Sequence, residues 1–327
     1  MRVLVTGGAG YIGSVVAESL IEAGEEVSVL DDLSAGHLAA IPPGVPVFRV
    51  DIRDRDAVLR CLREHPVDAV IHMAARSLVG ESVRRPDLYF WTNVSGTLSV
   101  LDAMVATGVS RFVLSSTASV YGEPVRQPIE EGDPTAPTNP YGASKLAVEA
   151  ALGWYESAFG LRSISLRYFN AAGASRLRGE DHRVETHLVP LVLRAAAAGT
   201  PIEVYGTDYP TPDGTCVRDY VHVLDLAEAH VQALHALVQG APGRIYNLGC
   251  GGAGYSVREV IDAAERVTGR KVTVRETARR AGDPSVLIAS SARARAALNW
   301  SPQHNSLEAI VGSAWAWMCQ HPGGYGD

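Results

Sequence analysis

The sequence of 327 residues has few cysteines, no long apolar run and no excess of basic residues. Its four cysteines are dispersed and form no CxxC pair, which argues against a structural zinc site or a redox motif. We therefore expect four free thiols, as in a reducing compartment. No run reaches the ~18 apolar residues of a membrane span, and the N-terminus lacks the features of a secretory signal. These absences predict a cytoplasmic protein with no membrane partner.

The charge balance argues against a nucleic-acid partner. The chain has 29 Lys and Arg against 36 Asp and Glu, a formal net charge of −7, whereas a duplex binder usually carries a basic excess. Ten histidines occur, but no pair is seen at ligand spacing with acidic residues around it, so no metal site is expected. The 46% of hydrophobic residues are enough for a folded core.

Short apolar runs alternate with helical patterns in the first half of the chain. Strands are expected at 3–5, 27–30, 47–50, 69–72 and 111–114, with helices such as 12–21 and 56–62 between them. Continuous apolar strands that alternate with helices indicate a parallel sheet covered on both faces. We expect an α/β protein with a Rossmann-type, doubly wound parallel sheet and a smaller mixed α/β substrate-binding domain.

The second half is less regular and suggests where the domains divide. Segments 171–186 and 206–219 have loop composition, whereas 222–250 again contains a helix and a strand. We expect residues 1–170 plus about 222–250 to form the sheet domain. The smaller domain would then comprise about 171–221 plus 251–327.

A Gly-rich turn lies between the first strand and the first helix. Thr6 to Gly13 read TGGAGYIG, and Asp31 follows 18 residues after the last glycine. Glycines let the backbone approach a pyrophosphate, and the carboxylate bonds ribose hydroxyls and repels a 2′-phosphate. No Arg or Lys occurs between Asp31 and Arg49, which favours NAD over NADP. The alternative is a structural turn followed by a solvated Asp.

A Tyr-Lys pair stands at the start of a long helical pattern. Tyr141 and Lys145 are four residues apart, so they share one face of a helix. A nearby ammonium favours the phenolate, and we expect it to lower the pKa of Tyr141 enough for a base near neutral pH. Ser116 or Thr117, after the strand at 111–114, is expected to bridge Tyr141 and a substrate oxygen.

Four motifs together resemble the extended short-chain dehydrogenase/reductase family. They are TGGAGYIG at 6–13, the Asp31–Asp32 pair, SSTASVYG at 115–122 and YGASK at 141–145. The resemblance is closest to the UDP-glucose 4-epimerases of that family and spans nearly the whole chain. Its most specific part is the block at 208–220, DYPTPDGTCVRDY. This block lies in the half of the chain expected to bind the substrate, rather than in the more general cofactor-binding half.

The resemblance implies interconversion of UDP-galactose and UDP-glucose by transient oxidation at C4, with bound NAD and a 4-keto intermediate. Tyr141 is then the base, Lys145 tunes it and holds the nicotinamide ribose, and Thr117 is the hydroxyl partner. NAD would be bound by Gly7, Gly10, Tyr11, Ile12, Gly13, Asp31, Asp32, Asp51, Ile52, Ala74, Ala75, Asn93, Ser115, Tyr141, Lys145 and Tyr168. The UDP-sugar would contact Thr117, Tyr141, Asn170, His187, Leu188, Val204, Tyr205, Arg218, Tyr220, Arg280 and Asp283. His187 is as compatible with a structural role, and the family suggests a homodimer through helices near 92–108 and 141–158.

Three alternatives remain open at this point. A 4,6-dehydratase would carry Asp-Glu directly after Thr117, where this chain has Ala118 and Ser119. Another UDP-sugar, such as a UDP-N-acetylhexosamine or a UDP-pentose, is the more serious rival, and Leu287 stands where a large aromatic residue excludes N-acetylated sugars in the family. The third alternative, a non-catalytic NAD(H) sensor, is disfavoured because Tyr141 and Lys145 are both present.

Overall fold

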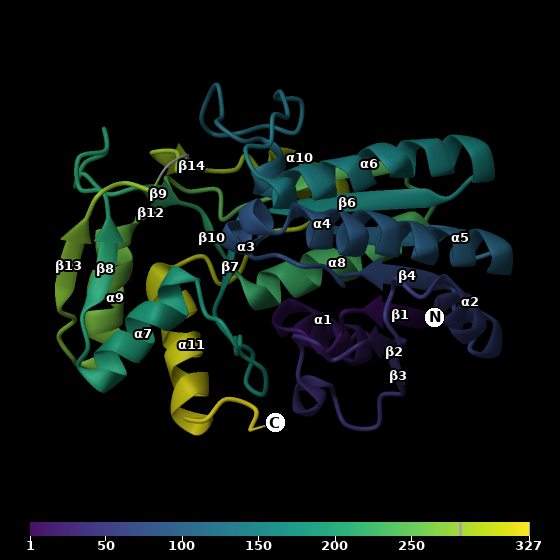
Figure 1. The fold of residues 1–327 in the computed structure, drawn as a ribbon, viewed down its shortest axis with the longest axis horizontal. Helices are drawn as coiled ribbons and strands as arrows, with labels where there is room; N and C mark the ends of the chain where they lie inside the picture. The colour runs from purple at the N-terminus through teal and green to yellow at the C-terminus, as the bar shows by residue number, and fades with distance from the viewer. Residues whose placement is uncertain (281–282, 327) are drawn as a thin grey trace.

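Seven parallel strands form the central sheet of the larger part of the molecule (Figure 1). The protein is described here from a computed structural model that covers residues 1–280 and 283–326. From one edge to the other, the order is β11 (Arg244–Leu248), β6 (Arg162–Tyr168), β5 (Arg111–Thr117), β4 (Ala69–His72), β1 (Arg2–Thr6), β2 (Glu26–Asp31) and β3 (Val47–Arg49). The strand order reverses direction between β1 and β4, which is where doubly wound sheets bind ligands. The predicted fold class is confirmed.

Alternate side chains of the strands enter two separate cores. Val3 and Val5 pack with α1 (Tyr11–Glu22) and α8 (Val223–Val238), whereas Leu4 faces the other core. That second core contains α2 (Arg55–Glu64), α5 (Thr97–Thr107) and α6 (Pro140–Phe159). Both faces are buried, and this is why these strands are apolar without alternation.

The chain returns to the large sheet late in the sequence. Strand β11 pairs in parallel with β6, and α8 packs against α1. Helix α10 (Ala292–Leu298) also lies with this part, since Leu298 and Trp300 are buried in the same core as Val3. Within residues 251–327, the stretch around 292–300 therefore covers the large sheet.

The smaller part has its own core between three helices and short strands. Helices α7 (Leu188–Ala198), α9 (Val257–Thr268) and α11 (Leu307–Gln320) pack beside the parallel pair β8 (Ile202–Tyr205) and β13 (Val274–Thr277). A mixed three-stranded sheet contains β12 (Tyr255–Ser256), β9 (Val217–Arg218) and β14 (Val286–Leu287). The pair β7 (Asn170–Ala172) and β10 (Tyr220–His222) lies between the two parts in Figure 1. The smaller part is mixed α/β, as predicted.

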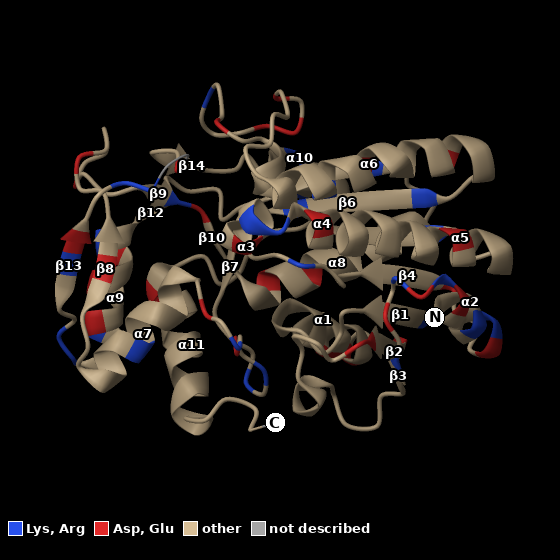
Figure 2. Ribbon diagram, in the orientation of Figure 1, with Lys and Arg blue, Asp and Glu red and all other residues tan. Residues whose placement is uncertain are grey.

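The remaining elements are short. They are η1 (Leu38–Ala40), α3 (Val79–Arg84), α4 (Pro86–Tyr89), the π-helical η2 (Phe90–Gly96) and η3 (Ala118–Val120). Within the described ranges, no helix is long and apolar enough to cross a membrane. All four cysteines are free thiols, as predicted. Figure 2 shows acidic and basic residues interspersed over both parts of the molecule.

Candidate active site

The Gly-rich turn passes too close to neighbouring backbone for side chains. Gly7 has φ +72°, and a Cβ atom there would lie 2.5 Å from the amide nitrogen of Ala74. A Cβ atom on Gly13 would lie 2.1 Å from the carbonyl oxygen of Gly7. Helix α1 begins at Tyr11 after Gly10, which supplies no side-chain cap. The first N–H groups of α1 are thus presented to a ligand, as a pyrophosphate site requires.

Asp31 holds its carboxylate beside this turn. It lies at the end of β2, is 8% exposed, and accepts hydrogen bonds from the Ala9 amide (3.0 Å) and the Leu33 amide (2.8 Å). Burial raises the pKa of Asp31, although both hydrogen bonds oppose the shift. Asp32 instead accepts from the amide and hydroxyl of Ser34. Together with the glycine cradle, the carboxylate of Asp31 fits the ribose and pyrophosphate of NAD.

Asp51 and Ile52, two of the predicted cofactor residues, are paired or packed within the protein. Asp51 forms an ion pair with Arg53 at 2.6 Å, and the hydrogen bonds from that guanidinium lower the pKa of Asp51. Ile52 is buried, and a Cβ atom on Gly96 would lie 2.7 Å from its side chain. Ile52 therefore packs between β3 and η2, and the Asp51 carboxylate is paired with the Arg53 guanidinium.

The Asn93 side chain holds the loop after β4 in place through hydrogen bonds. Its Oδ1 accepts from the Arg76 amide at 2.8 Å, and its Nδ2 donates to the Arg76 carbonyl at 3.0 Å and to Ser144 Oγ at 2.9 Å. These contacts join residues 74–76 to α6. Ala74 and Ala75, two of the predicted cofactor residues, lie in the loop that Asn93 fixes.

Helix α6 brings Tyr141 and Lys145 to the end of β5. Its N-cap, Asn139, accepts from the Gly142 amide at 2.9 Å. The Lys145 ammonium is buried and donates to the Ser115 carbonyl at 2.9 Å. Burial lowers the pKa of Lys145 to about 8, against the opposing charge of Glu149.

The pKa of Tyr141 differs from the sequence prediction. Burial raises it above the ordinary value, and the hydrogen bond from Thr117 opposes that rise. Tyr141 is half-buried, and the ring of Tyr89 stands edge-on to its ring, with the ring centroids 6.5 Å apart. In the protein alone, desolvation thus outweighs the stabilisation of the phenolate that the Tyr-Lys spacing suggested.

The structure distinguishes between the two candidate hydroxyls. Ser116 donates to Glu149 Oε1 at 2.5 Å, and Glu149 forms a buried ion pair with Arg167. Ser116 is therefore part of the packing between α6 and the sheet. Thr117 is the residue that reaches Tyr141. On the next strand, the Tyr168 hydroxyl is hydrogen-bonded to Ser115 Oγ, and the Ser115 carbonyl accepts from Lys145. Both predicted cofactor residues therefore lie close to Lys145.

Arg218 and Asp283 on the substrate side are joined directly. The buried guanidinium of Arg218 forms an ion pair with the Asp283 carboxylate and donates to the Val217 carbonyl at 2.8 Å. Arg280 lies over the ring of Tyr205, with its guanidinium carbon 3.8 Å from the ring centre. These four predicted residues gather where β8, β9 and the segment before β14 meet.

The other predicted substrate residues differ in their exposure. Asn170 donates its amide to the Asp219 carbonyl at 3.0 Å. Val204 and Tyr220 are buried in the core of the smaller part. Desolvation raises the pKa of the Tyr220 phenol.

His187 and Leu188 lie at the start of α7, in a cluster that the sequence interpretation missed. His187 is the N-cap of α7, and its Nδ1 is 2.7 Å from Glu180 Oε1. Glu180, His182, Glu185 and His187 place ligand-type atoms within 4.8 Å of one another. The signal is present as the spacing of two, three and two residues in EDHRVETH at 180–187. The expectation that no histidine pair stands among acidic residues at ligand spacing is therefore wrong for this segment.

A Gly-rich turn, an acidic residue ending β2 and a Tyr-Lys pair at the end of β5 define an NAD-binding enzyme of the short-chain dehydrogenase/reductase type. Residues 3–249 match the model of the NAD dependent epimerase/dehydratase family. A UDP-glucose 4-epimerase from Streptomyces lividans is 52% identical over 100% of this chain and 98% of its own length.

Solved structures agree with this assignment. A crystal structure of a UDP-glucose 4-epimerase has a TM-score of 0.97 at 44% identity and covers 99% of both chains. The UDP-glucose 4-epimerase from Brucella ovis, in complex with NAD, has a TM-score of 0.93 at 45% identity, covering 96% of this chain and 97% of its own. The chain belongs to the NAD dependent epimerase/dehydratase family and, within it, to the UDP-glucose 4-epimerases.

Proposed function

We propose that this chain interconverts UDP-galactose and UDP-glucose by transient oxidation at C4. The observation that carries the proposal is the half-buried Tyr141, whose phenol is hydrogen-bonded by Thr117 and which lies four residues from the buried Lys145 on α6. This group stands at the carboxyl end of β5 in a sheet whose first turn is built for a pyrophosphate. A base in that position can act on a sugar hydroxyl presented from the smaller part.

In this reaction, Tyr141, Thr117 and Lys145 have separate roles. Tyr141 takes the proton of the sugar 4-hydroxyl, and Thr117 holds that oxygen in line. The Lys145 ammonium stabilises the phenolate. NAD, when bound, supplies a reversible hydride acceptor, so no net oxidation occurs. The 4-ketopyranose turns its other face while the UDP stays in place, and Tyr141 returns the proton.

The arginines would hold the diphosphate during that turn. Arg218 and Arg280 present guanidinium groups from β9 and from the segment before β14, and guanidinium suits bidentate contact with phosphate. Asp283 forms an ion pair with Arg218 and would accept a hydrogen bond from a ribose hydroxyl. Asn170 and the backbone near Tyr205 would contact the sugar and the uracil. Binding energy from the UDP is then available while the sugar remains free to rotate.

The test is turnover of UDP-galactose without added cofactor, with the product resolved by NMR. We expect UDP-glucose to form, because NAD stays bound through the cycle. Tyr141→Phe should lose turnover and keep NAD, whereas Tyr155→Phe on the same helix should retain turnover. Absence of turnover in the NAD-loaded protein would favour a non-catalytic sensor. Binding of a partner by such a sensor should not change in Tyr141→Phe.

Leu287 supports a second substrate, a UDP-N-acetylhexosamine. It lies in β14 opposite Arg218 of β9 and packs against the cluster of Val120, Tyr121 and Ile129. A leucine occupies less space than a tyrosine at this edge of the site. We expect epimerisation of UDP-N-acetylglucosamine by the unchanged protein, and its selective loss in Leu287→Tyr. Equal rates for both proteins would exclude Leu287 as the gate.

We further propose a homodimer formed through α5 and α6. Large apolar side chains are exposed along η2, α5 and α6: Phe90, Trp91, Val105, Trp154 and Phe159. Trp154 is 77% exposed, which is unusual for a tryptophan on a stable monomer surface. Pairing of this face between two copies would bury these side chains.

We also propose a cytoplasmic location. The four free thiols support it, because such thiols persist in a reducing compartment.

A further inference from the structure

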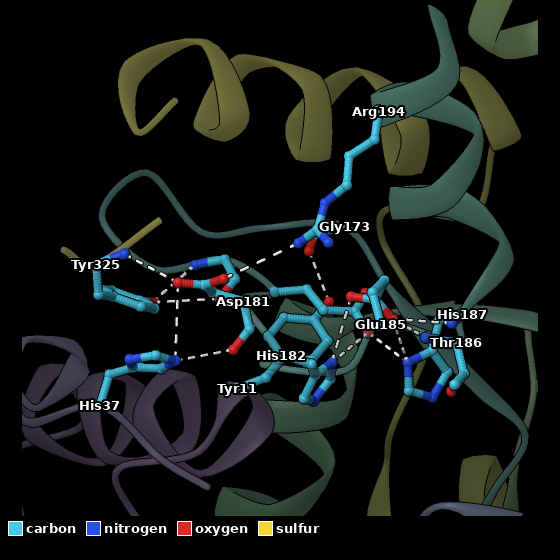
Figure 3. A network of polar contacts seen from close by, with 12 residues as sticks. Tyr11, His37, Gly173, Asp181, His182, Glu185, Thr186, His187, Arg194 and Tyr325 are labelled. Atoms are coloured by element: carbon cyan, nitrogen blue, oxygen red, sulfur yellow. Dashed lines mark hydrogen bonds and ion pairs between the residues drawn. The ribbon is translucent and has the colours of Figure 1, made fainter. Parts of the chain in front are cut away.

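Two glutamates and two histidines converge in the segment that leads into α7. His182, Glu185 and His187 of this group are labelled in Figure 3. We call Glu180, His182, Glu185 and His187 the Glu/His cluster. His182 Nδ1 lies 3.3 Å from Glu180 Oε1 and 3.4 Å from Glu185 Oε2. His187 Nδ1 lies 2.7 Å from Glu180 Oε1 and 3.1 Å from Glu185 Oε1. One ligand-type nitrogen or oxygen of each residue lies within 4.8 Å of those of the other three.

The carboxylates of the cluster are buried and incompletely hydrogen-bonded. The Glu185 side chain is 2% exposed and that of Glu180 is 7% exposed. Glu185 Oε2, Glu180 Oε1 and His182 Nδ1 are buried atoms whose close neighbours in the cluster do not meet hydrogen-bond geometry. The ion pairs recorded for both glutamates within the described chain are with imidazoles rather than with Lys or Arg. Two buried carboxylates require positive charge between them.

We propose that the Glu/His cluster binds one divalent transition-metal ion, and that this ion is Zn²⁺. Imidazole nitrogen and carboxylate oxygen are both zinc ligands at about 2.0–2.2 Å. A tetrahedron of that size separates its ligand atoms by roughly 3.4 Å, close to the two separations that His182 makes. Ca²⁺ and Mg²⁺ prefer oxygen ligands alone, so the imidazoles favour zinc over both.

The charge of the ion matches the charge of the cluster. A divalent cation balances Glu180 and Glu185 and leaves both imidazoles neutral, which is the form that binds metal. Asp181, between two of the ligands, is directed elsewhere. Its Oδ2 accepts from the Tyr325 amide at 3.0 Å, as Figure 3 shows. Asp181 is therefore a carboxylate of the same segment that lies outside the proposed ligand set.

The position of the cluster indicates what the ion does. His182 stands edge-on to the ring of Tyr11, with centroids 6.3 Å apart, and Tyr11 donates its hydroxyl to the Gly173 carbonyl at 2.6 Å. Tyr11 begins α1 directly after the Gly-rich turn, and Leu188 begins α7 directly after the cluster. A bound ion would clamp the 180–187 segment between the two parts of the molecule.

The first test is a Co²⁺ titration of the untagged, chelator-treated protein, followed by displacement with Zn²⁺. We expect the visible absorption of four-coordinate Co²⁺, saturation at one ion per chain, and loss of the signal when Zn²⁺ is added. Zn²⁺ should also raise the Tm of the NAD-loaded protein. If the protein binds no Co²⁺ or Zn²⁺, or binds without a tetrahedral spectrum, the proposal is wrong.

Variants then locate the ion. Glu185→Gln and His182→Gln should each weaken Zn²⁺ at least 10-fold, whereas Asp181→Asn should bind as the unchanged protein does. Far-UV circular dichroism and retained NAD check that each variant is folded. Equal Zn²⁺ affinity in all three variants would place the ion elsewhere and overturn the assignment. The titration of the unchanged protein decides the question even where a variant does not fold.

Discussion

In the proposed mechanism, the hydroxyl of Thr117 connects the Tyr141 base to the substrate oxygen. Thr117→Val removes this hydroxyl and nearly preserves the shape, so we expect kcat for UDP-galactose to fall about 10²-fold, as for loss of a positioned proton-transfer partner. Thr117→Ser keeps the oxygen and should stay within about threefold of the unchanged enzyme. Steady-state kcat and KM for both variants check this. Similar losses in Val and Ser variants would show that Thr117 acts only through packing.

The Gly-rich turn and its acidic residue could be predicted from the sequence, but the electrostatics of the candidate site could not. Gly7, Gly13 and Asp31 follow from strand–turn–helix context, and the structure gives each a contact that explains its type. The pKa of Tyr141 depends on how completely the phenol is enclosed, and this is set by residues distant in sequence. The partner of Ser116 was also hidden, because Glu149 reaches it from another element.

Helix α6 is held to the sheet by a buried ion pair. Glu149 on α6 and Arg167 on β6 are 3% and 4% exposed, and the hydrogen bonds to Glu149 raise the pKa of Arg167 although burial lowers it. Glu149→Gln leaves the guanidinium without a countercharge, and we expect a loss of about 3–5 kcal/mol in the free energy of unfolding. Urea denaturation of the NAD-loaded protein measures it.

Two further variants serve as controls for this prediction. Glu156→Gln, on the same helix and exposed, should change the free energy of unfolding by less than about 0.5 kcal/mol. Replacing both partners, Glu149→Gln with Arg167→Met, should recover part of the loss, since no charge remains buried. A double variant less stable than Glu149→Gln alone would contradict the role of the unpaired charge.

Long elements were predictable, and the short ones were not. The strands at 3–5 and 69–72 and the helix around 12–21 have continuous apolar or periodic patterns. Strands of two or three residues, such as β7 and β10, are too short for a periodic pattern and form because tertiary contacts align them. The π-helical η2 also has no sequence pattern of its own, yet its Asn93 positions the loop after β4.

The exposed apolar face on η2, α5 and α6 leads to a prediction about assembly. If two copies pair through it, Trp154→Glu places a charge in the interface and should convert the dimer to a monomer in light scattering at micromolar concentration. Val125→Glu, also at an exposed apolar position but outside these helices, should leave the dimer intact. A monomeric unchanged protein would refute the proposed dimer directly.

Three buried histidines make the folded molecule sensitive to acid. Burial lowers the pKa of His72 to about 3 and those of His222 and His230 to about 4, with further lowering by Lys145 at His72 and by His304 at His222. These values lie below the value of about 6.5 in an unfolded chain. The unfolded state therefore binds protons first, so the contribution of each neutral histidine is complete above pH 6.5 and is lost as pH falls toward 4.

His230 offers a clean test of this linkage. Its ring is fully buried, with Nδ1 2.8 Å from the Leu226 carbonyl and no partner within the described residues for Nε2. In His230→Phe the group that titrates is gone, so the stability of the variant relative to the unchanged protein should rise by about 2 kcal/mol between pH 7 and pH 5. Urea denaturation at both pH values, with NAD saturating, measures this difference. His65→Phe, at an exposed position, should show a much smaller change, and an equal change in both variants would rule out burial of His230 as the cause.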